Sequence, residues 1–114
     1  MDHLIFYRRT IQKILTEYHE ISCRTPDTDG IDTILALDEQ RDQYFWLRVG
    51  WNEGDHITNM MVYIRIKDGK IYIEQDWTEE GMATELLGEG IPPEDIVLAF
   101  QPPEMRQHTE FALA

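Results

Sequence analysis

The side chains that could act as nucleophiles are few and lie close together in the sequence. Ser22 is the only serine, Cys23 is the only cysteine, and His19 precedes that cysteine by one turn of a predicted helix. A thiolate beside an imidazole is an arrangement that nucleophilic catalysis uses. An incidental contact at the end of a helix explains the same spacing, and we favour it. We therefore expect the chain not to be an enzyme.

The histidines and the acidic loop do not have the spacing of a metal centre. His3, His19, His56 and His108 include no HxxxH pair, and a single cysteine excludes CxxC. Residues 27–32 hold three aspartates and a glycine, but an EF-hand calcium loop needs its glycine at position six and a glutamate at position twelve. No glycine-rich phosphate-binding motif occurs either. We expect no metal and no cofactor.

Asp68, Gly69 and Lys70 fit the acid-x-lysine signature of metal-dependent nucleases, with Asp55 upstream as a second carboxylate. In such enzymes both carboxylates lie along one strand, on the face that holds the metal ion. Asp-Gly is also the dipeptide that favours a two-residue hairpin turn, because both turn positions must tolerate a positive φ. The turn explains Asp68 and Gly69 without chemistry, and we favour that interpretation.

An acidic cluster surrounds one tryptophan. Glu74, Asp76, Glu79 and Glu80 lie within a few positions of Trp77. Such carboxylates can steer a basic partner toward the surface, and a tryptophan can anchor the interface. The alternative is an ordinary solvated helix start, in which acidic residues favour the helix dipole. We predict that these five residues bind a partner.

The composition predicts one acidic domain. The chain has 114 residues, of which 42% are hydrophobic, and a net charge of −12. Domains typically have about 100 to 200 residues, so we expect residues 1–114 to form one domain. A surface of this charge repels phosphate groups, so we expect the isolated chain to bind nucleic acid weakly and not to associate with membranes. A basic protein partner fits better.

Cysteine content and hydropathy indicate the compartment. A lone cysteine forms no intramolecular disulfide and fits a reducing environment. The apolar run at residues 4–7 is too short for the core of a signal peptide, and no run approaches the ~18 residues of a membrane span. We expect a cytoplasmic protein.

Hydrophobic periodicity predicts a long N-terminal helix followed by hairpins. Over residues 3–21, including Ile21, apolar side chains recur every three or four positions, which is typical of a helix with one apolar face. We favour packing of this face on a sheet; a seam between two copies, giving a homodimer, is the alternative. Strands are predicted at residues 31–37, 44–51 and 57–67, with a tight turn at 68–69.

The tight turn also predicts the register of the second hairpin. It sets Ile64 opposite Ile73 on an aliphatic face, and Tyr63 opposite Glu74 on the other face. We predict that Thr78 caps a second helix with Glu79 and Glu80 in its first turn, and residues 96–100 fit either a buried strand or a helical segment. The fold class is therefore α+β: an antiparallel β-meander packed by the long N-terminal helix and the second helix.

Several segments together form a pattern that is specific in its order and spacing. They are residues 38–44 (DEQRDQY), 49–51 (VGW), 66–73 (IKDGKIYI), 95–100 (DIVLAF), and Arg106 with 109–112 (TEFA). This pattern resembles the XisI family, called fdxN element excision controlling factor proteins, and the similarity is collinear over nearly the whole chain.

The resemblance implies a cytoplasmic protein, common in cyanobacteria and usually encoded beside a XisH-type protein. It implies control over the excision of a DNA element by a separate site-specific recombinase, and it brings no catalytic residue or cofactor. XisH-type proteins look nuclease-like, and many XisI-like chains occur outside any excision element. An antitoxin-like regulator of a nuclease-like partner is therefore an open alternative.

The sequence leaves three candidate functions for this chain. The first is a non-catalytic regulatory protein that docks on a XisH-like partner. The second is an accessory factor that binds DNA directly, which needs the basic residues to converge on one surface. These residues are Arg8, Arg9, Lys13, Arg24, Arg65, Lys67 and Lys70. The third is an enzyme or ligand-binding protein that uses His19, Cys23 or the carboxylates.

Overall fold

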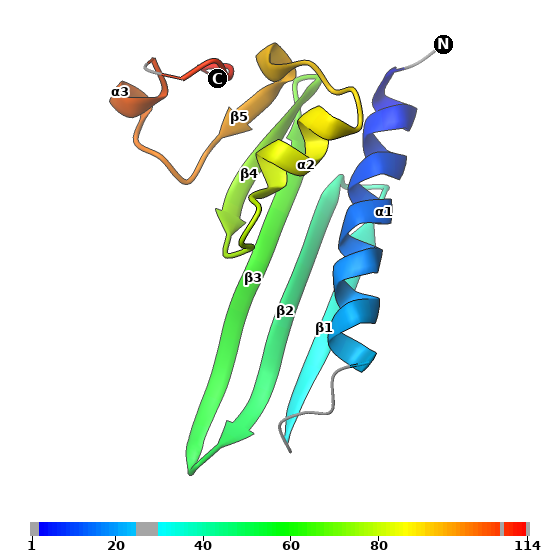
Figure 1. Ribbon diagram of the computed structural model, residues 1–114, viewed down its shortest axis with the longest axis vertical. Coiled ribbons are helices and arrows are strands. Elements are labelled where there is room, and N and C mark those ends of the chain that lie inside the picture. Colours follow the sequence, from blue (N-terminus) through cyan, green and yellow to red (C-terminus); the bar gives the residue numbers. More distant parts are fainter. Residues whose placement is uncertain (1–2, 25–29, 108, 114) are drawn as a thin grey trace.

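The helices and strands follow one another along the chain as local hairpins with a helix at the start. The computed structural model describes residues 3–24, 30–107 and 109–113 (Figure 1). Within these ranges the elements are α1 His3–Arg24, β1 Ile31–Asp38, β2 Gln43–Asn52, β3 Asp55–Lys67, β4 Lys70–Asp76, α2 Met82–Gly88, the 3-10 helix η1 Pro93–Asp95, β5 Ile96–Leu98 and α3 Pro103–Arg106.

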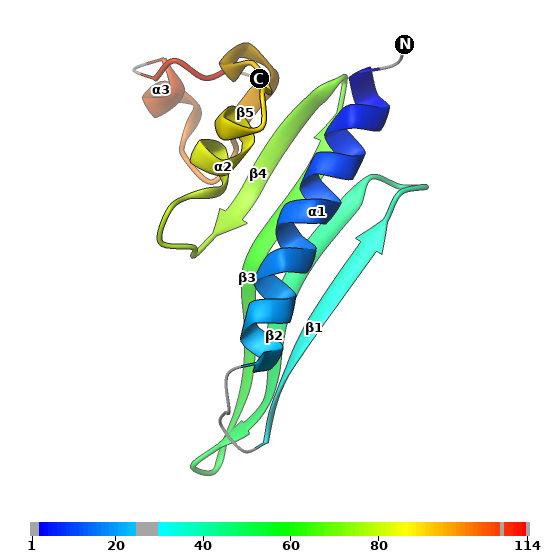
Figure 2. The same ribbon diagram turned by 45° about the vertical axis from the view of Figure 1, so that its right-hand side comes forward.

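The strands of the described residues form one sheet in the order β1-β2-β3-β4-β5. The first four strands are antiparallel to their neighbours, and β5 is parallel to β4. Helices α1 and α2 lie on the same face of the sheet (Figures 1 and 2). The predicted α+β class is confirmed, and the segment that fitted a strand or a helix contains the strand β5.

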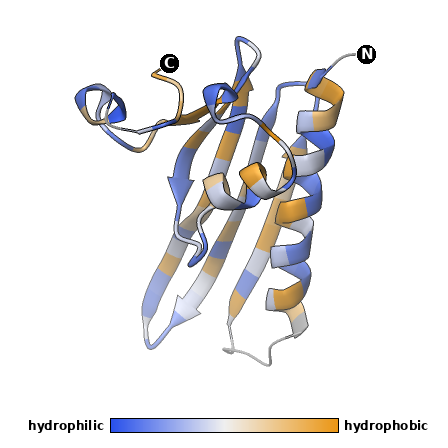
Figure 3. Ribbon diagram, turned by 45° about the horizontal axis from the view of Figure 1, so that its top comes forward, coloured by the Kyte–Doolittle hydropathy of each residue, from blue (hydrophilic) through white to orange (hydrophobic). Residues whose placement is uncertain are grey.

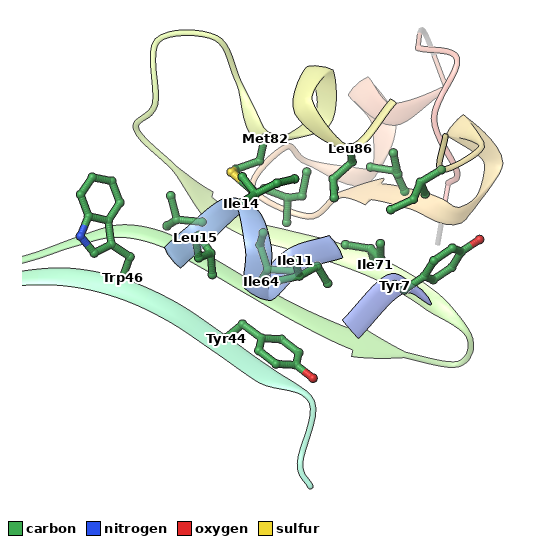
Figure 4. Close-up of a cluster of buried hydrophobic side chains, with 14 of the residues drawn as sticks. Tyr7, Ile11, Ile14, Leu15, Tyr44, Trp46, Ile64, Ile71, Met82 and Leu86 are labelled. Carbon is green, nitrogen blue, oxygen red and sulfur yellow. The ribbon is translucent and has the colours of Figure 1, made fainter. Parts of the chain in front are cut away.

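The core lies between α1, α2 and the covered face of the sheet (Figure 4). The alternating pattern of the strands and the 3.6-residue pattern of the helices both contribute side chains to this core, because each element directs one set of side chains inward. Its buried members include Tyr7, Ile11, Ile14 and Leu15 of α1, Tyr44, Trp46, Val62, Ile64, Ile71 and Ile73 of the strands, and Met82 and Leu86 of α2. Figure 3 shows the apolar stripe along the helix. Ile21, predicted on that stripe, is 59% exposed, because it lies in the last turn of α1, beyond the core.

The β3–β4 hairpin confirms part of the predicted register. Ile64 pairs with Ile73 across the turn, at which Asp68 and Gly69 both have positive φ. The predicted pair of Tyr63 with Glu74 is wrong, because the register shifts next to Ile64 and sets Tyr63 opposite Gln75. A bulge leaves one extra residue in one strand, and Glu74 is that residue.

The first hairpin depends on a close approach of two glycines. Gly50 of β2 pairs with Ile31, and Trp51 N–H donates to the carbonyl of Gly30 at 2.9 Å. A Cβ at position 50 would lie 1.8 Å from that carbonyl oxygen. Because no side chain fits there, this contact explains the glycine in the VGW segment.

An ion pair joins α1 to the turn between β1 and β2. Arg8 donates to both carboxylate oxygens of Asp42, from Nε at 2.7 Å and from Nη2 at 3.1 Å. Tyr44 OH donates to the same carboxylate at 3.0 Å. The Arg8 guanidinium, together with the Tyr44 hydroxyl, holds the pKa of Asp42 below its usual value, against the opposing effect of burial.

Two further contacts join α1 to α2. Tyr18 OH donates to Glu85 at 2.6 Å, and Lys13 Nζ lies 3.1 Å from a carboxylate oxygen of Glu89. The Tyr18 ring also stacks on Trp46, with ring centroids 5.7 Å apart. These contacts join the two helices side by side, with α1 over β1 and β2 and α2 over β4.

We expect Ile64→Ala to lower the free energy of unfolding by about 2–5 kcal/mol, because truncating a fully buried aliphatic side chain leaves a cavity. Ile34, which is 40% exposed on the opposite face of the sheet, provides the matched control. Ile34→Ala should cost less than about 1 kcal/mol. Urea denaturation measures both variants, and equal losses would contradict the assignment of the core to one face.

The Arg8–Asp42 pair predicts a pH dependence of stability. Since the folded pKa of Asp42 lies below the unfolded value, its ionised form stabilises the fold above about pH 4, and this stabilisation is lost as the pH falls through the folded pKa. Asp42→Asn should therefore cost roughly 1 kcal/mol at pH 7, with a smaller difference from the unmodified chain near pH 3. Denaturation at a series of pH values measures the difference. If the difference in unfolding free energy between Asp42→Asn and the unmodified chain stays constant down to pH 3, the charge of Asp42 does not stabilise the fold.

Candidate partner-binding surface

The carboxylate of Asp76 organises the turn from β4 into α2. One oxygen accepts from the Thr78 N–H at 3.0 Å and from the Thr78 hydroxyl at 2.7 Å. The other accepts from the Met82 N–H at 2.7 Å. The Thr78 hydroxyl in turn accepts from the Gly81 N–H at 3.1 Å. One side chain thus satisfies several backbone and side-chain donors of the loop.

This network corrects the predicted start of the second helix. Thr78 does not cap it; α2 begins at Met82, with Gly81 before it at φ 87°. Glu79 and Glu80 therefore lie in the loop and not in the first turn of the helix. A capping rule based on the sequence favours Thr78 as the residue that accepts from the first helical N–H. In the structure Asp76 supplies that acceptor oxygen, and the Thr78 hydroxyl donates to Asp76.

Trp77 is held by its backbone while its ring faces solvent. Its N–H donates to the Met61 carbonyl at 2.9 Å, yet the residue is 69% exposed. A pocket of about 570 Å³ lies beside it. The lining residues are Thr58, Asn59, Met60, Met61, Gln75 and Trp77. An exposed tryptophan beside a partly apolar pocket is typical of a contact surface for another molecule.

The four predicted carboxylates do not form one rim. Glu74 accepts from Arg65 Nε at 2.8 Å, and Asp76 is engaged by the loop. Glu79 and Glu80 are exposed. The structure thus brings Trp77 together with Glu79 and Glu80 in one short exposed loop, while Glu74 belongs to a cross-strand ion pair. We call Trp77, Glu79 and Glu80 the acidic loop.

The residues considered for nucleophilic chemistry meet outside this surface. Cys23 Sγ lies 3.7 Å from His19 Nε2, and Cys23 is exposed near the end of α1. Neither a histidine nor a cysteine lines the pocket beside Trp77. The pair lies near the C-terminal end of α1 and does not line the pocket beside Trp77.

The nuclease and metal interpretations receive no geometric support. Asp55 begins β3 and Asp68 follows its end, so about 40 Å of extended strand separates the two carboxylates. Among the described residues, no group of three or more His, Cys, Asp and Glu side chains could hold a metal ion. Asp27 and Asp29, of the segment compared with a calcium loop, lie outside the described residues.

The clearly shifted pKa values belong to structural contacts. Burial and the hydrogen bond to Glu85 raise the pKa of Tyr18 to about 12. Burial also raises the pKa of Tyr7, which donates to Asp95, and that of Tyr44, which donates to Asp42. These shifts move each hydroxyl further from neutral pH, so the tyrosines act as hydrogen-bond donors and not as acid–base groups.

Carboxylates engage three of the basic residues considered for DNA binding. Arg8 pairs with Asp42, Lys13 with Glu89, and Arg65 with Glu74. Lys67 lies over the ring of Tyr72, with Nζ 5.7 Å from the centroid. The side chain of Arg24 is outside the described part of the chain. Internal pairing therefore weakens the positive field that phosphate binding requires.

The architecture defines the class first: a two-layer α+β protein with a meander sheet and its two longer helices on one face. The model of the XisI protein family matches residues 1–113, and the chain belongs to that family. The sequence resemblance is thereby confirmed.

The solved structures that match this chain include two of high similarity. A XisI-like protein from Anabaena variabilis ATCC 29413 is 36% identical, with a TM-score of 0.89, and the match covers 97% of this chain and 99% of the other. The fdxN element excision controlling factor XisI from the same organism is 44% identical, with a TM-score of 0.88 and coverage of 99% and 100%. No curated protein matches the chain. In the described residues, no helix is long and apolar enough to cross a membrane.

We expect Asp76→Ala to lower the free energy of unfolding by about 1–3 kcal/mol, because it leaves the loop donors of Thr78 and Met82 without their acceptor. Glu79→Ala, in the same loop but exposed, should change stability by less than about 0.5 kcal/mol. Thermal and urea denaturation measure both. If Asp76→Ala is as mild as Glu79→Ala, Asp76 does not organise the turn.

Proposed function

We propose that this chain is a non-catalytic regulatory protein that controls the excision of a DNA element by a separate site-specific recombinase. It does so by binding a XisH-like protein through the acidic loop. Membership of the XisI family and the solved relative described as an excision controlling factor support the regulatory role. The exposed ring of Trp77 beside the pocket is the observation that carries the choice of surface.

The charges support a protein partner over DNA. The chain carries −12, and Arg8, Lys13 and Arg65 are engaged by carboxylates of the same chain. Glu79 and Glu80 remain exposed, so they contribute to the field that an approaching partner meets. A basic partner is steered toward such a loop, whereas a phosphate backbone is repelled. Binding alters the partner's activity without chemistry on this chain.

We expect the double variant E79K/E80K to bind the co-encoded XisH-like protein with an association rate several-fold lower at low salt. The difference should shrink as salt rises, because screening removes steering. Trp77→Ala should instead raise the dissociation rate by roughly tenfold or more, as expected for an anchor residue. Stopped-flow or surface-based kinetics at two ionic strengths separate these effects.

The matched control reverses two exposed charges elsewhere, at Glu20 on α1 and Glu104 on α3. It should change the association rate less than E79K/E80K does. If both double variants lower the association rate equally, the net charge of the chain steers the partner, and the acidic loop has no special role. Absence of any complex between the unmodified chain and the XisH-like protein would overturn the proposal. Fluorescence anisotropy tests the alternative: tight, sequence-selective binding of this chain alone to DNA from the ends of the element would favour direct DNA binding.

A further inference from the structure

Strand β3 is longer than the strand that pairs with it on its outer side. Strand β4 pairs with β3 only from Val62 to Lys67, whereas β2 pairs with β3 from Asp55 to Arg65. Residues 55–61 therefore have a strand neighbour on one side only. Figure 1 shows β3 and β2 continuing well past the end of β4. This free edge is about 20 Å long.

The hydrogen-bond pattern identifies the backbone groups that face the free edge. Trp51 N–H points toward β1, where it donates to Gly30, so alternation directs Asn52 and Gly50 toward β3. Their partners Asp55 and Ile57 consequently face β2. His56 lies between these two residues and Thr58 follows Ile57, so both direct their N–H and C=O groups away from β2 and toward the free edge.

This stretch has few of the features that usually block an edge strand: one charged residue at its outer end, Asp55, and one bulge. It reads DHITNMM, without lysine or proline, and its bulge lies at its inner end, where the register shifts opposite Trp46. A strand edge with few such features is a template for pairing with another chain. The last bond on this side is the one from Trp77 N–H to Met61, which marks where the free edge begins.

A side-chain pocket lies at that point. The cavity of about 570 Å³ is lined by Thr58, Met60 and Met61 of the edge strand together with Trp77 and others. An exposed edge supplies main-chain hydrogen bonds, and a neighbouring pocket selects one side chain. Together these are the two components of recognition by strand addition.

The charges beside the edge select the occupant. Residues 52–61 and 74–80 contain no lysine or arginine. Their carboxylates are Glu53, Asp55, Asp76, Glu79 and Glu80, together with Glu74, which pairs with Arg65. A second copy of the chain would bring two such acidic borders together, and two chains of −12 repel each other. An extended segment that carries lysine or arginine is attracted to both ends of the edge.

We propose that an extended, basic segment of the partner protein adds as a strand to the free edge of β3, in line with β4. It places one apolar side chain in the pocket beside Trp77. This inference rests on the proposed function, since it specifies how the partner is held at the acidic loop. The sheet then gains backbone pairing where β4 ends.

The test uses a pair of proline variants in the full chain with the co-encoded XisH-like protein. Thr58→Pro removes an N–H that faces the free edge and leaves every carboxylate in place. Thr33→Pro is the matched control: Thr33 lies on β1 at the opposite edge of the sheet, and the same alternation directs its N–H outward. We expect Thr58→Pro to weaken binding at least tenfold and Thr33→Pro to change it less than twofold.

Amide hydrogen exchange of the unmodified complex gives a second readout that needs no variant to fold. The amides of His56 and Thr58 should become protected on binding, whereas Ile57 and Asn59, which already bond to β2, should change little. Unaltered exchange at His56 and Thr58, or unaltered binding by a folded Thr58→Pro variant, would overturn strand addition.

The binding measurements also distinguish a failure of this inference from a failure of the proposed function. If E79K/E80K weakens binding and Thr58→Pro does not, the partner binds at the acidic loop without adding a strand. If the unmodified chain forms no complex, the proposed function fails and this inference fails with it. Protection of His56 in the free chain that rises with its concentration, with a doubled molecular mass, would assign the edge to a second copy instead.

Discussion

The carboxylate of Asp76 determines where the chain leaves the sheet. It pairs opposite Val62 as the last residue of β4, and its oxygens then accept from the loop and from the first helical N–H of α2. Because the strand stops there, Trp77 is turned to the surface, and Met82 enters the core a few residues later. The same stop leaves residues 55–60 of β3 without an outer strand neighbour. The candidate surface is thus a consequence of one well-satisfied side chain.

The two-layer architecture follows from covering only one face of the sheet. Helices α1 and α2 pack on the face that carries Tyr44 and Ile64, and the ion pair of Arg8 with Asp42 fixes α1 at the end of the first hairpin. The opposite face carries cross-strand pairs such as Phe45 with Tyr63, whose rings lie edge to face at 5.8 Å.

The sequence predicted those features that depend on neighbours a few residues apart. The apolar stripe of α1, the strands of the meander and the Asp68–Gly69 turn all follow from local periodicity and turn chemistry. The bulge that moves Tyr63 from Glu74 to Gln75 does not, because hairpin geometry alone sets a continuous register. The start of α2 was missed for a related reason: its first N–H bonds to Asp76, six residues upstream, and a local capping rule does not consider that distance. Parallel pairing of β5 with β4 likewise depends on tertiary packing.

Net charge and the free edge are linked. An unblocked strand edge promotes pairing between identical chains, and lysines or prolines on the edge are the common protection. Here Arg8, Lys13 and Arg65 are engaged by internal carboxylates, while Glu53, Asp55, Glu79 and Glu80 near the free edge are exposed. Two copies of such a chain repel each other at long range, while a basic segment is drawn toward the same edge. In the proposed complex the acidic composition opposes self-pairing of this edge and favours a partner of opposite charge, whereas a lysine within residues 55–61 would oppose such a partner.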